Sequence, residues 1–565
     1  METPVELIIG HVALPIGDLF RKGDRPNSLL AAPGLSTDNL PLSRESCYNV
    51  AVTQPTTILA HDLGTTGDKA TLFDAATGAA LAATFEAYPT AYPHPNWVEQ
   101  DPAHWQAAVF AGTRRLLERA GVAPAAVAAV SFSGTMQGAL PVDAAGQPLR
   151  PSIIWADQRA TVQSDAICAA CGADAIYRLT GLRASPSYTA AKMLWVREHQ
   201  PEIFRRTHKV LQVKDYAAFL LTGVLATDYS DASGTQLFDI RARRWVEDMA
   251  TAIGLPAVIL PDLYPSATVI GGVTPTAAAA TGLLAGTPVV LGGGDGACAT
   301  VGSGAVAERD AYTYIGASAW LALSAAEPLL DPGQRTITMA HLHPRLYFTL
   351  GNMQSAGGAY DWLAGLLAAA GEAKDFRALD ALAAGAPPGA GGLLFLPHLL
   401  GERAPYWNPA ARGAFVGLAM PHGRAEMARA TLEGVALHLR LILDTLREQG
   451  AAVQAMRLIG GGAQSALWRQ ILADALGLPI LLPGLTAEAT SLGAAIAGGV
   501  GVGLYPDFGI ASQLIPVYEA EQLDPTTAAR YDELVGLYAE TYRALEPIFR
   551  RLNKMNQEPH CTIIR

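Results

Sequence analysis

The chain has 565 residues, and its 40 Lys and Arg against 51 Asp and Glu give a formal net charge of −11. Half of the residues are hydrophobic and only 16% are charged, which excludes disorder over most of the chain and predicts several folded domains. The acidic balance disfavours a nucleic-acid-binding surface, and no stretch of about 18 uninterrupted apolar residues predicts a membrane span. Five scattered cysteines form neither a disulfide framework nor a zinc motif, so we expect a cytoplasmic protein.

Residues 1–57 show little periodicity and are rich in Pro, Ser, Asn and Arg. We expect a poorly ordered extension there, and whether it belongs to the native protein is left open. The chain that follows alternates short strands with helices, which predicts a layered α/β fold. We expect strands at 58–62, 69–73, 79–88, 127–133 and 287–291, and helices at 105–119 and 190–198.

The second half of the chain repeats a pattern from the first. A strand, a small-residue turn and a second strand are predicted over 311–324, as they are around Asp62. Two further glycine clusters lie at 291–296 and 458–465. We therefore expect two similar lobes, joined near 304–309, with glycine turns that face a shared cleft.

The turn from Asp62 to Lys69 suits a phosphate chain. Its glycines let the backbone approach phosphate closely, its two threonines offer hydroxyls, and Asp62 at the strand end suits a Mg²⁺ shell. A hairpin turn that is merely rich in Gly and Thr explains the pattern about equally well. His61 points to the opposite face of the strand, where a buried core histidine is the better reading.

Asp295 follows a predicted strand in the run Gly294–Ala299, which formally matches a dinucleotide-binding fingerprint. That reading needs an acidic residue about 20 positions further on, and Asp310 is somewhat too near. In a kinase, Asp295 would instead accept the proton of a substrate hydroxyl. No Gly-Lys-Ser/Thr sequence is present, which excludes a P-loop kinase.

Taken together, the motifs resemble the FGGY family of carbohydrate kinases, and within it the xylulokinase branch. The resemblance runs from about Ile58 to about Phe549, and the order of its motifs along one chain favours a kinase over a dehydrogenase. The motifs are Asp62–Thr66, Ile154–Arg159, Lys214–Tyr216, Ser230–Thr235, Gly292–Asp295, Phe395–Arg403 and Gly460–Asp474.

The resemblance implies two ribonuclease-H-like lobes with the active site in the cleft between them. The sugar-binding lobe would span 58–305 and the ATP-binding lobe 306–550, followed by a tail at 551–565. Asp295 would be the catalytic base, and Asp62 would attend Mg²⁺ through water. Met136, Gln137, Trp155, Asp157 and Asp295 would contact the sugar, with Arg159 either binding sugar or holding Asp157. The nucleotide would meet Gly64, Thr65, Thr66, Lys69, Gly316, Ala317, Ser318, Gly460, Gly461, Gly462, Ala463 and Ser465.

Three positions depart from the family pattern. Gln137 stands where many xylulokinases have His, which changes the preference among sugars. Ala317 replaces the usual Thr and removes one phosphate-facing hydroxyl, and Gly296 replaces a larger polar residue after the base. The pair Glu402 and Arg403 either holds the back wall of the cleft or touches the ligand.

The expected activity is phosphorylation of D-xylulose to D-xylulose 5-phosphate with ATP and Mg²⁺. Two alternatives stay open: another FGGY activity on ribulose, gluconate or a polyol, and a catalytically weak sugar-binding sensor. The expected partners are the small sugar and MgATP, without nucleic acid or membrane, and a homodimer is left open.

Overall fold

The computed structural model describes residues 6–9, 12–15, 56–368 and 373–557. The chain divides into two compact units, Met1–Thr53 and Gln54–Arg565. In the first, strands β1 (Glu6–Ile9) and β2 (Val12–Pro15) pair antiparallel. The sequence analysis assigned no strand there. The rest of the expected extension up to residue 55 lies outside the described residues, as does most of the expected tail, whereas Thr57, the last residue of that extension, already begins β3.

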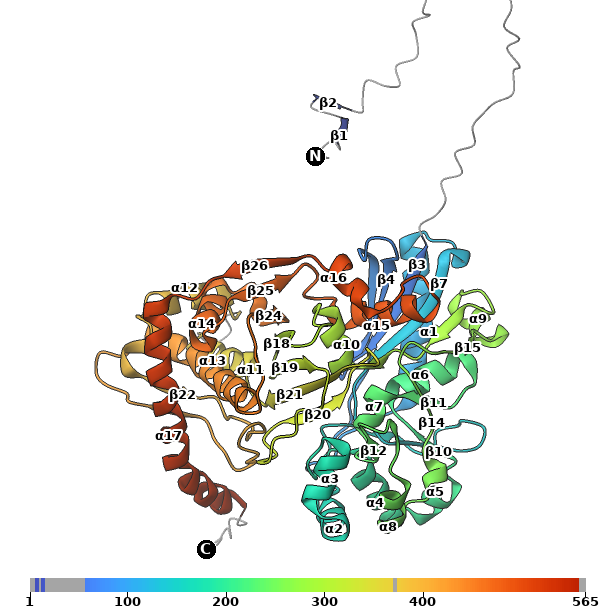
Figure 1. The fold of residues 1–565 in the computed structure, drawn as a ribbon, viewed down its shortest axis with the longest axis horizontal. Helices are drawn as coiled ribbons and strands as arrows, with labels where there is room; N and C mark the ends of the chain where they lie inside the picture. Colours follow the sequence, from blue (N-terminus) through green and yellow to red (C-terminus); the bar gives the residue numbers. More distant parts are fainter. Residues whose placement is uncertain (1–5, 10–11, 16–55, 369–372, 558–565) are drawn as a thin grey trace, which may run out of the picture. The chain divides into compact units, whose positions relative to one another are not determined.

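The second unit consists of two lobes, each built on a seven-stranded mixed sheet (Figure 1). The first lobe contains β3 (Thr57–Leu63), β4 (Gly67–Asp74), β5 (Ala80–Ala87), β6 (Glu99–Gln100), α1 (Pro102–Ala120), β7 (Val127–Gly134), β8 (Leu140–Val142), β9 (Ser152–Ile153), α2 (Thr161–Cys171), α3 (Ala173–Thr180), α4 (Thr189–His199), α5 (Pro201–Arg206), β10 (Lys209–Leu211), α6 (Val213–Thr222), β11 (Ala226–Asp228), α7 (Tyr229–Ser233), β12 (Phe238–Asp239), β13 (Arg244–Trp245), α8 (Glu247–Ala252), β14 (Asp262–Tyr264), β15 (Val269–Gly272), α9 (Pro275–Thr281), β16 (Pro288–Val290), β17 (Gly293–Gly294) and α10 (Asp295–Gly302).

The second lobe follows after residue 310. It contains β18 (Ala311–Ile315), β19 (Ala319–Ala325), β20 (Ile337–Ala340), β21 (Tyr347–Met353), α11 (Gly357–Leu367), α12 (Phe376–Ala384), β22 (Leu394–Leu396), β23 (Ala414–Val416), α13 (Arg424–Glu448), β24 (Met456–Ile459), α14 (Ala466–Leu476), β25 (Ile480–Pro483), α15 (Ala489–Gly501), α16 (Ala511–Leu514), β26 (Val517–Glu521) and α17 (Pro525–Gln557). All five strands and both helices predicted by residue range in the first lobe are present, with bounds within a few residues of those expected.

The two sheets share the order of their five central strands. In the first lobe this order is β5-β4-β3-β7-β16, and in the second it is β21-β19-β18-β24-β25. The pairing also agrees, because the first three strands of each set are antiparallel and the last two join in parallel. The predicted internal repeat is therefore confirmed at the level of the fold.

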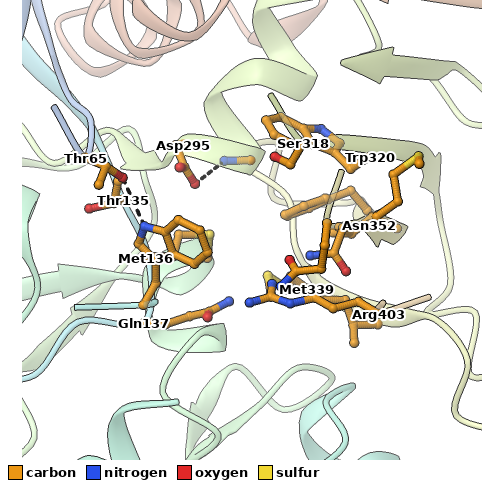
Figure 2. Close-up of a pocket in the computed structure, with 17 residues that line it drawn as sticks. Thr65, Thr135, Met136, Gln137, Asp295, Ser318, Trp320, Met339, Asn352 and Arg403 are labelled. Carbon is orange, nitrogen blue, oxygen red and sulfur yellow. Dashed lines mark hydrogen bonds between the residues drawn. The ribbon is translucent and has the colours of Figure 1, made fainter. Parts of the chain in front are cut away.

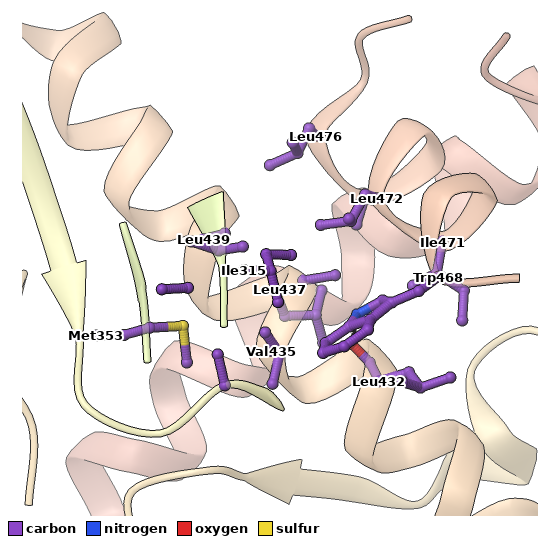
Figure 3. Close-up of a cluster of buried hydrophobic side chains, with 14 of the residues drawn as sticks. Ile315, Met353, Leu432, Val435, Leu437, Leu439, Trp468, Ile471, Leu472 and Leu476 are labelled. Atoms are coloured by element: carbon purple, nitrogen blue, oxygen red, sulfur yellow. Dashed lines mark hydrogen bonds between the residues drawn. The ribbon is translucent and has the colours of Figure 1, made fainter. Parts of the chain in front are cut away.

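Buried apolar side chains hold each lobe together and join the two lobes. In the second lobe, the sheet packs against α13 and α14 through a cluster that includes Ile315, Leu432 and Trp468 (Figure 3). A second cluster contains residues of β3, α10 and α15 and thus crosses between the lobes. No helix in the described ranges is long and apolar enough to cross a membrane.

Helices α10 and α15 cross so closely that only glycine fits at the contact. A Cβ atom on Gly302 would lie 1.6 Å from the carbonyl oxygen of Ala489, and one on Gly493 would lie 1.9 Å from that of Cys298. Each helix therefore places a glycine against the backbone of the other. The crossing joins the lobes beside residues 304–309, where the sequence predicted the connection.

Candidate active site

Asp295 is the first residue of α10, directly after the short strand β17. The backbone N–H of Gly294 donates to Ser230 Oγ at 3.0 Å, and Asp295 Oδ1 accepts the N–H of Gly296 at 2.7 Å. Burial, and then the charge of Asp62, raise the pKa of Asp295 to about 7. A carboxylate with a pKa near neutrality matches the task of a general base.

Asp62 lies next to the end of β3 and affects Asp295 through its charge. Burial, and further the neighbouring Asp68, raise the pKa of Asp62 to about 6. Lys69 stands opposite Asp62 on β4, but its Nζ pairs with Glu488 at 2.8 Å and donates to the carbonyl of Ala487 at 3.1 Å. In this structure Lys69 therefore ties the first lobe to the start of α15.

His61, beside Asp62, lies on the other face of the strand, as predicted. It is fully buried, and its ring nitrogens lie 2.8 Å from Asp68 Oδ2 and 3.1 Å from Thr113 Oγ1. Both nitrogens have partners in the core, so the reading of His61 as a core histidine is confirmed.

The turn after β3 is held by side chains around it. Tyr88 donates its hydroxyl to the carbonyl of Gly64 at 2.6 Å, and Gln100 Nε2 donates to the carbonyl of Thr65 at 2.7 Å. Trp155 Nε1 donates to Thr65 Oγ1 at 3.0 Å, while Thr66 is exposed. These contacts fix the backbone of the turn, and the N–H of Gly64 donates within it to the carbonyl of Gly67 at 2.9 Å. Among the described residues nothing accepts the N–H groups of Thr65 and Thr66, which stay available to a ligand.

A pocket of about 180 Å³ lies between the lobes (Figure 2). Both lobes contribute to its wall, and Asp295 and Thr65 are among the lining residues. The others are Thr135, Met136, Gln137, Trp155, Gly296, Ser318, Trp320, Ile337, Met339, Phe348, Leu350, Asn352, Met353, Gln354 and Arg403. A pocket of this size suits a monosaccharide, and four of the five residues predicted to contact sugar line it.

Asp157, the fifth of these residues, is not among those that line the pocket. It is fully buried, and Arg159 donates to its two carboxylate oxygens at 2.7–3.0 Å. The backbone N–H of Val98 donates to the same carboxylate. Of the two roles the sequence left open for Arg159, the structure shows the one in which it holds Asp157, and Asp157 in turn fixes the segment that carries Trp155.

A second pocket of about 520 Å³ opens on the other side of the turn between β18 and β19. Gly316, Ala317, Gly461, Gly462 and Ser465 line it, as do Gly357 and Gly358, which the sequence analysis did not identify. The turn itself is braced, because the N–H groups of Gly357 and Gly358 donate to the carbonyls of Gly316 and Ala317 at 2.8 and 2.9 Å. Ser318, the last residue of the same turn, lines the first pocket. The turn therefore separates the two pockets.

Two predicted nucleotide-binding residues, Gly460 and Ser465, shape the backbone around this second pocket. Gly460 has a φ of +86°, and a Cβ on it would lie 2.6 Å from the carbonyl oxygen of Ile315. Ser465 Oγ accepts the N–H of Trp468 at 3.1 Å and so caps α14. Gly460 and Ala463 are not among the residues that line the pocket.

The sequence analysis did not identify three pocket residues of the second lobe that could hydrogen-bond a sugar, and it left a fourth undecided. Trp320, Asn352 and Gln354 belong to β19 and the end of β21, and Arg403 was left undecided. They line the pocket only because the two lobes face one another. The order of residues along the chain does not predict which residues of the second lobe face the first. The glycine pair 357–358, which braces the predicted phosphate turn at 316–318, was visible in the sequence but was not identified.

Known proteins with similar sequences and structures agree with this geometry. Residues 57–302 match the N-terminal domain, and residues 311–502 the C-terminal domain, of the FGGY family of carbohydrate kinases. The chain is 38% identical over 416 residues to a xylulose kinase of Escherichia coli, covering 74% of this chain and 84% of that one. A solved xylulose kinase of Rhodospirillum rubrum is 32% identical with a TM-score of 0.80, covering 87% and 100%. A gluconate kinase of Lactobacillus acidophilus is 28% identical with a TM-score of 0.83, covering 88% and 99%.

Proposed function

The chain belongs to the FGGY family of carbohydrate kinases, and within it we propose that the protein phosphorylates D-xylulose at its terminal hydroxyl, with ATP as the donor. Sugar phosphorylation with ATP follows from the family. The choice of D-xylulose is supported by the xylulose kinases among its relatives. It is further supported by a pocket whose size suits a five-carbon sugar.

The observation that carries the proposal is the position of the 316–318 turn between two pockets. Its glycine and alanine line the larger pocket, and its serine lines the smaller one, which also contains Asp295. A nucleotide whose adenosine occupied the larger pocket would pass its phosphates over the turn toward Asp295. The sugar hydroxyl and the γ-phosphoryl group would then meet between Asp295 and the turns after β3 and β18.

In the proposed reaction, Asp295 orients the sugar hydroxyl and accepts its proton. The hydroxyl oxygen forms a bond to the γ-phosphorus as the bond from that phosphorus to the bridging β–γ oxygen breaks, which leaves ADP and the sugar phosphate. Because the transition state is loose, the base mainly orients the hydroxyl and receives the proton late. The two turns would stabilise phosphate charge through the backbone N–H groups that the turns do not use themselves, since those of Gly64 and Gly316 are bonded within their turns.

Mg²⁺ fits the residues at the end of β3. Asp62 offers a half-buried carboxylate whose raised pKa reflects burial beside other acidic groups, and a hard divalent cation would relieve that repulsion. We propose that Asp62 holds the ion through a water molecule. When bound, Mg²⁺ would neutralise phosphate charge during transfer.

The proposal is tested by measuring ADP release with a panel of ketoses, polyols and sugar acids. We expect the highest kcat/KM for D-xylulose. The Asp295→Ala variant should lose roughly 10³-fold in kcat while ATP affinity, measured by calorimetry, stays within about twofold. The exposed Asp165→Ala substitution on α2 is the matched control and should leave both values unchanged. An Asp295→Ala variant that keeps most of its sugar-dependent ADP release would refute the assignment of the base.

Gluconate is the second candidate substrate, since the gluconate kinase above has a closely similar fold. Faster turnover of gluconate than of any ketose would replace D-xylulose in the proposal. Saturable sugar binding without ADP release from any sugar would favour the sensor. A cytoplasmic location is a further proposal, supported by the free thiols of Cys168, Cys171 and Cys298.

A further inference from the structure

Arg403 lines the sugar pocket from the second lobe, and no described residue accepts a hydrogen bond from its guanidinium. Within residues 56–368 and 373–557 the guanidinium makes no hydrogen bond or ion pair, although it lies 5.7 Å from the ring centroid of Trp155 across the cleft. Burial lowers the pKa of the group. A guanidinium carries five N–H donors and can accept nothing, so its burial is costly unless a ligand supplies acceptors.

The neighbouring carboxylate of Glu402 forms no direct ion pair with the Arg403 guanidinium, because its oxygens are used elsewhere. Glu402 Oε1 accepts the backbone N–H groups of Arg403 and Gln354 at 2.8 and 2.9 Å, and Oε2 lies 2.9 Å from His398 Nδ1. Both Arg403 and Gln354 line the pocket, so one buried carboxylate fixes the backbone of two wall residues. The backbone of Arg403 is thereby held while its side chain is left to bind something else.

The histidines around Glu402 complete this support. His398, Glu402 and His438 are close enough together to hold a metal ion, and all three are buried. However, His398 Nδ1 faces the Glu402 carboxylate, and His438 Nε2 lies 2.8 Å from the carbonyl oxygen of Ala404. Both contacts require N–H donors, and burial lowers the pKa of His398 to about 3 and that of His438 to about 4. The two histidines are therefore neutral, and with Glu402 they form a hydrogen-bonded support for the loop that carries Arg403.

Gln137 faces Arg403 from the first lobe. Figure 2 shows the two side chains pointing toward one another, with Asp295 and Ser318 at the other end of the pocket. Gln137 has a φ of +71°, and Lys192 Nζ donates to the backbone carbonyl oxygen of Gln137 at 2.7 Å, which leaves the side-chain amide free of that contact. A left-handed backbone in a residue other than glycine is strained, and such strain collects at ligand-binding positions. Two donor-bearing side chains are thus held at the end of the pocket remote from the base.

We infer that Arg403 and Gln137 together bind the carbonyl oxygen of an open-chain ketose while Asp295 engages the hydroxyl at the other end. This inference rests on the proposed function and extends it, because it makes the pocket selective for ketoses over polyols. A carbonyl oxygen only accepts hydrogen bonds, which suits a guanidinium and an amide N–H. A polyol hydroxyl can also accept from Arg403, but its own O–H then needs an acceptor that the guanidinium cannot supply.

The test compares D-xylulose with xylitol, which carries a hydroxyl in place of the carbonyl. Both affinities are measured by calorimetry, so turnover of the polyol is not required, and kcat/KM is measured for the ketose. We expect Arg403→Gln to weaken ketose binding and to lower kcat/KM at least about tenfold, the loss expected for charged hydrogen bonds. Xylitol affinity should change less than about twofold. The exposed Arg345→Gln substitution in the same lobe is the control and should change neither.

Three results would overturn the inference. Equal losses for ketose and polyol would mean that Arg403 acts only through its contact with Trp155 and lobe closure. No loss for the ketose would mean that Arg403 binds nothing there. Tighter binding of a five-carbon aldonate than of the ketose, abolished in Arg403→Gln, would assign the acceptor to a carboxylate. Failure of the proposed function is distinguished by the wild-type protein, which would then release no ADP with any ketose whatever the variant does.

Discussion

The two lobes share a strand order but differ in what they place at equivalent turns. In the first lobe the hairpin between β3 and β4 follows Asp62, and the helix after the last parallel strand begins with Asp295. In the second lobe the equivalent hairpin is the neutral turn Gly316–Ser318, and the equivalent helix begins at Ala489. The two lobes therefore share a backbone fold but not its function. The first lobe carries the two carboxylates of the site, Asp62 and Asp295, and the second carries the larger pocket lined by glycines.

The largest expected effect concerns the two carboxylates of the first lobe. The pKa of Asp62 is raised to about 6 and that of Asp295 to about 7, from 3.8. Since the base must be ionised, kcat/KM should fall about tenfold per pH unit below pH 6, with an apparent pKa that belongs to the pair. The measurement is a profile of kcat/KM against pH, from about pH 5 to about pH 9. An acid limb below about pH 5 would contradict the coupling of the two carboxylates.

Stability provides an independent check on the same pair. A carboxyl whose folded pKa lies above its unfolded value binds its proton more tightly when folded, so its ionisation costs stability. That cost is absent below the unfolded pKa of 3.8 and is complete above about pH 7. Asp295→Asn should therefore raise the melting temperature by a few degrees at pH 8 and leave it unchanged at pH 4. A melting temperature unaffected at both values would show that Asp295 is not buried beside a like charge.

The crossing of α10 and α15 offers a test of the symmetry between the lobes. Gly302→Ala and Gly493→Ala each force a Cβ to within 2 Å of a carbonyl of the other helix, as the distances of 1.6 and 1.9 Å require. Each should destabilise the folded state by about 2 kcal/mol or more in urea unfolding. Gly536→Ala on the exposed face of α17, where a Cβ meets nothing within 4 Å, is the control and should stabilise slightly. If the two substitutions lowered the free energy of unfolding by very different amounts, the two helices would not be equivalent at their crossing.

The smallest expected effect lies at the neutral turn of the second lobe. Ala317 lines the larger pocket and offers no hydroxyl, whereas the hairpin of the first lobe carries Thr65 and Thr66. Ala317→Thr adds one hydroxyl where phosphates are proposed to pass, so the KM for ATP should fall by about threefold with little change in kcat. Ala317→Val, which adds similar bulk without a hydroxyl, is the control. A fall in KM with valine would attribute the gain to packing.

Much of the frame could be predicted because its signals are local. The hairpin after Asp62, the strand before Asp295 and the repeat beginning at Ala311 all depend on turn chemistry and short-range periodicity. The motifs also indicated the family, which the matching domain models confirm. The predicted roles of the site residues stay predictions until the variants are measured.

The remainder depends on contacts between distant parts of the chain. Lys69 pairs with Glu488, and Arg403 reaches a pocket whose opposite wall is formed by Gln137. Neither pairing has a pattern in the sequence, since register and spacing act only over neighbouring residues. Asp157 illustrates the same limit, because the sequence left two roles open for Arg159, and the fold shows that Arg159 and the backbone N–H of Val98 use the oxygens of Asp157.

Helix α10 carries Asp295 at its first residue and meets α15 at Cys298 and at its last residue, Gly302. If one half of the molecule turns against the other about that junction, points close to it travel least and points far from it travel most. The proton acceptor would then stay nearly still while the adenosine pocket is carried along an arc. The enzyme could thus admit and discharge its bulky co-substrate without disturbing the alignment of the small one.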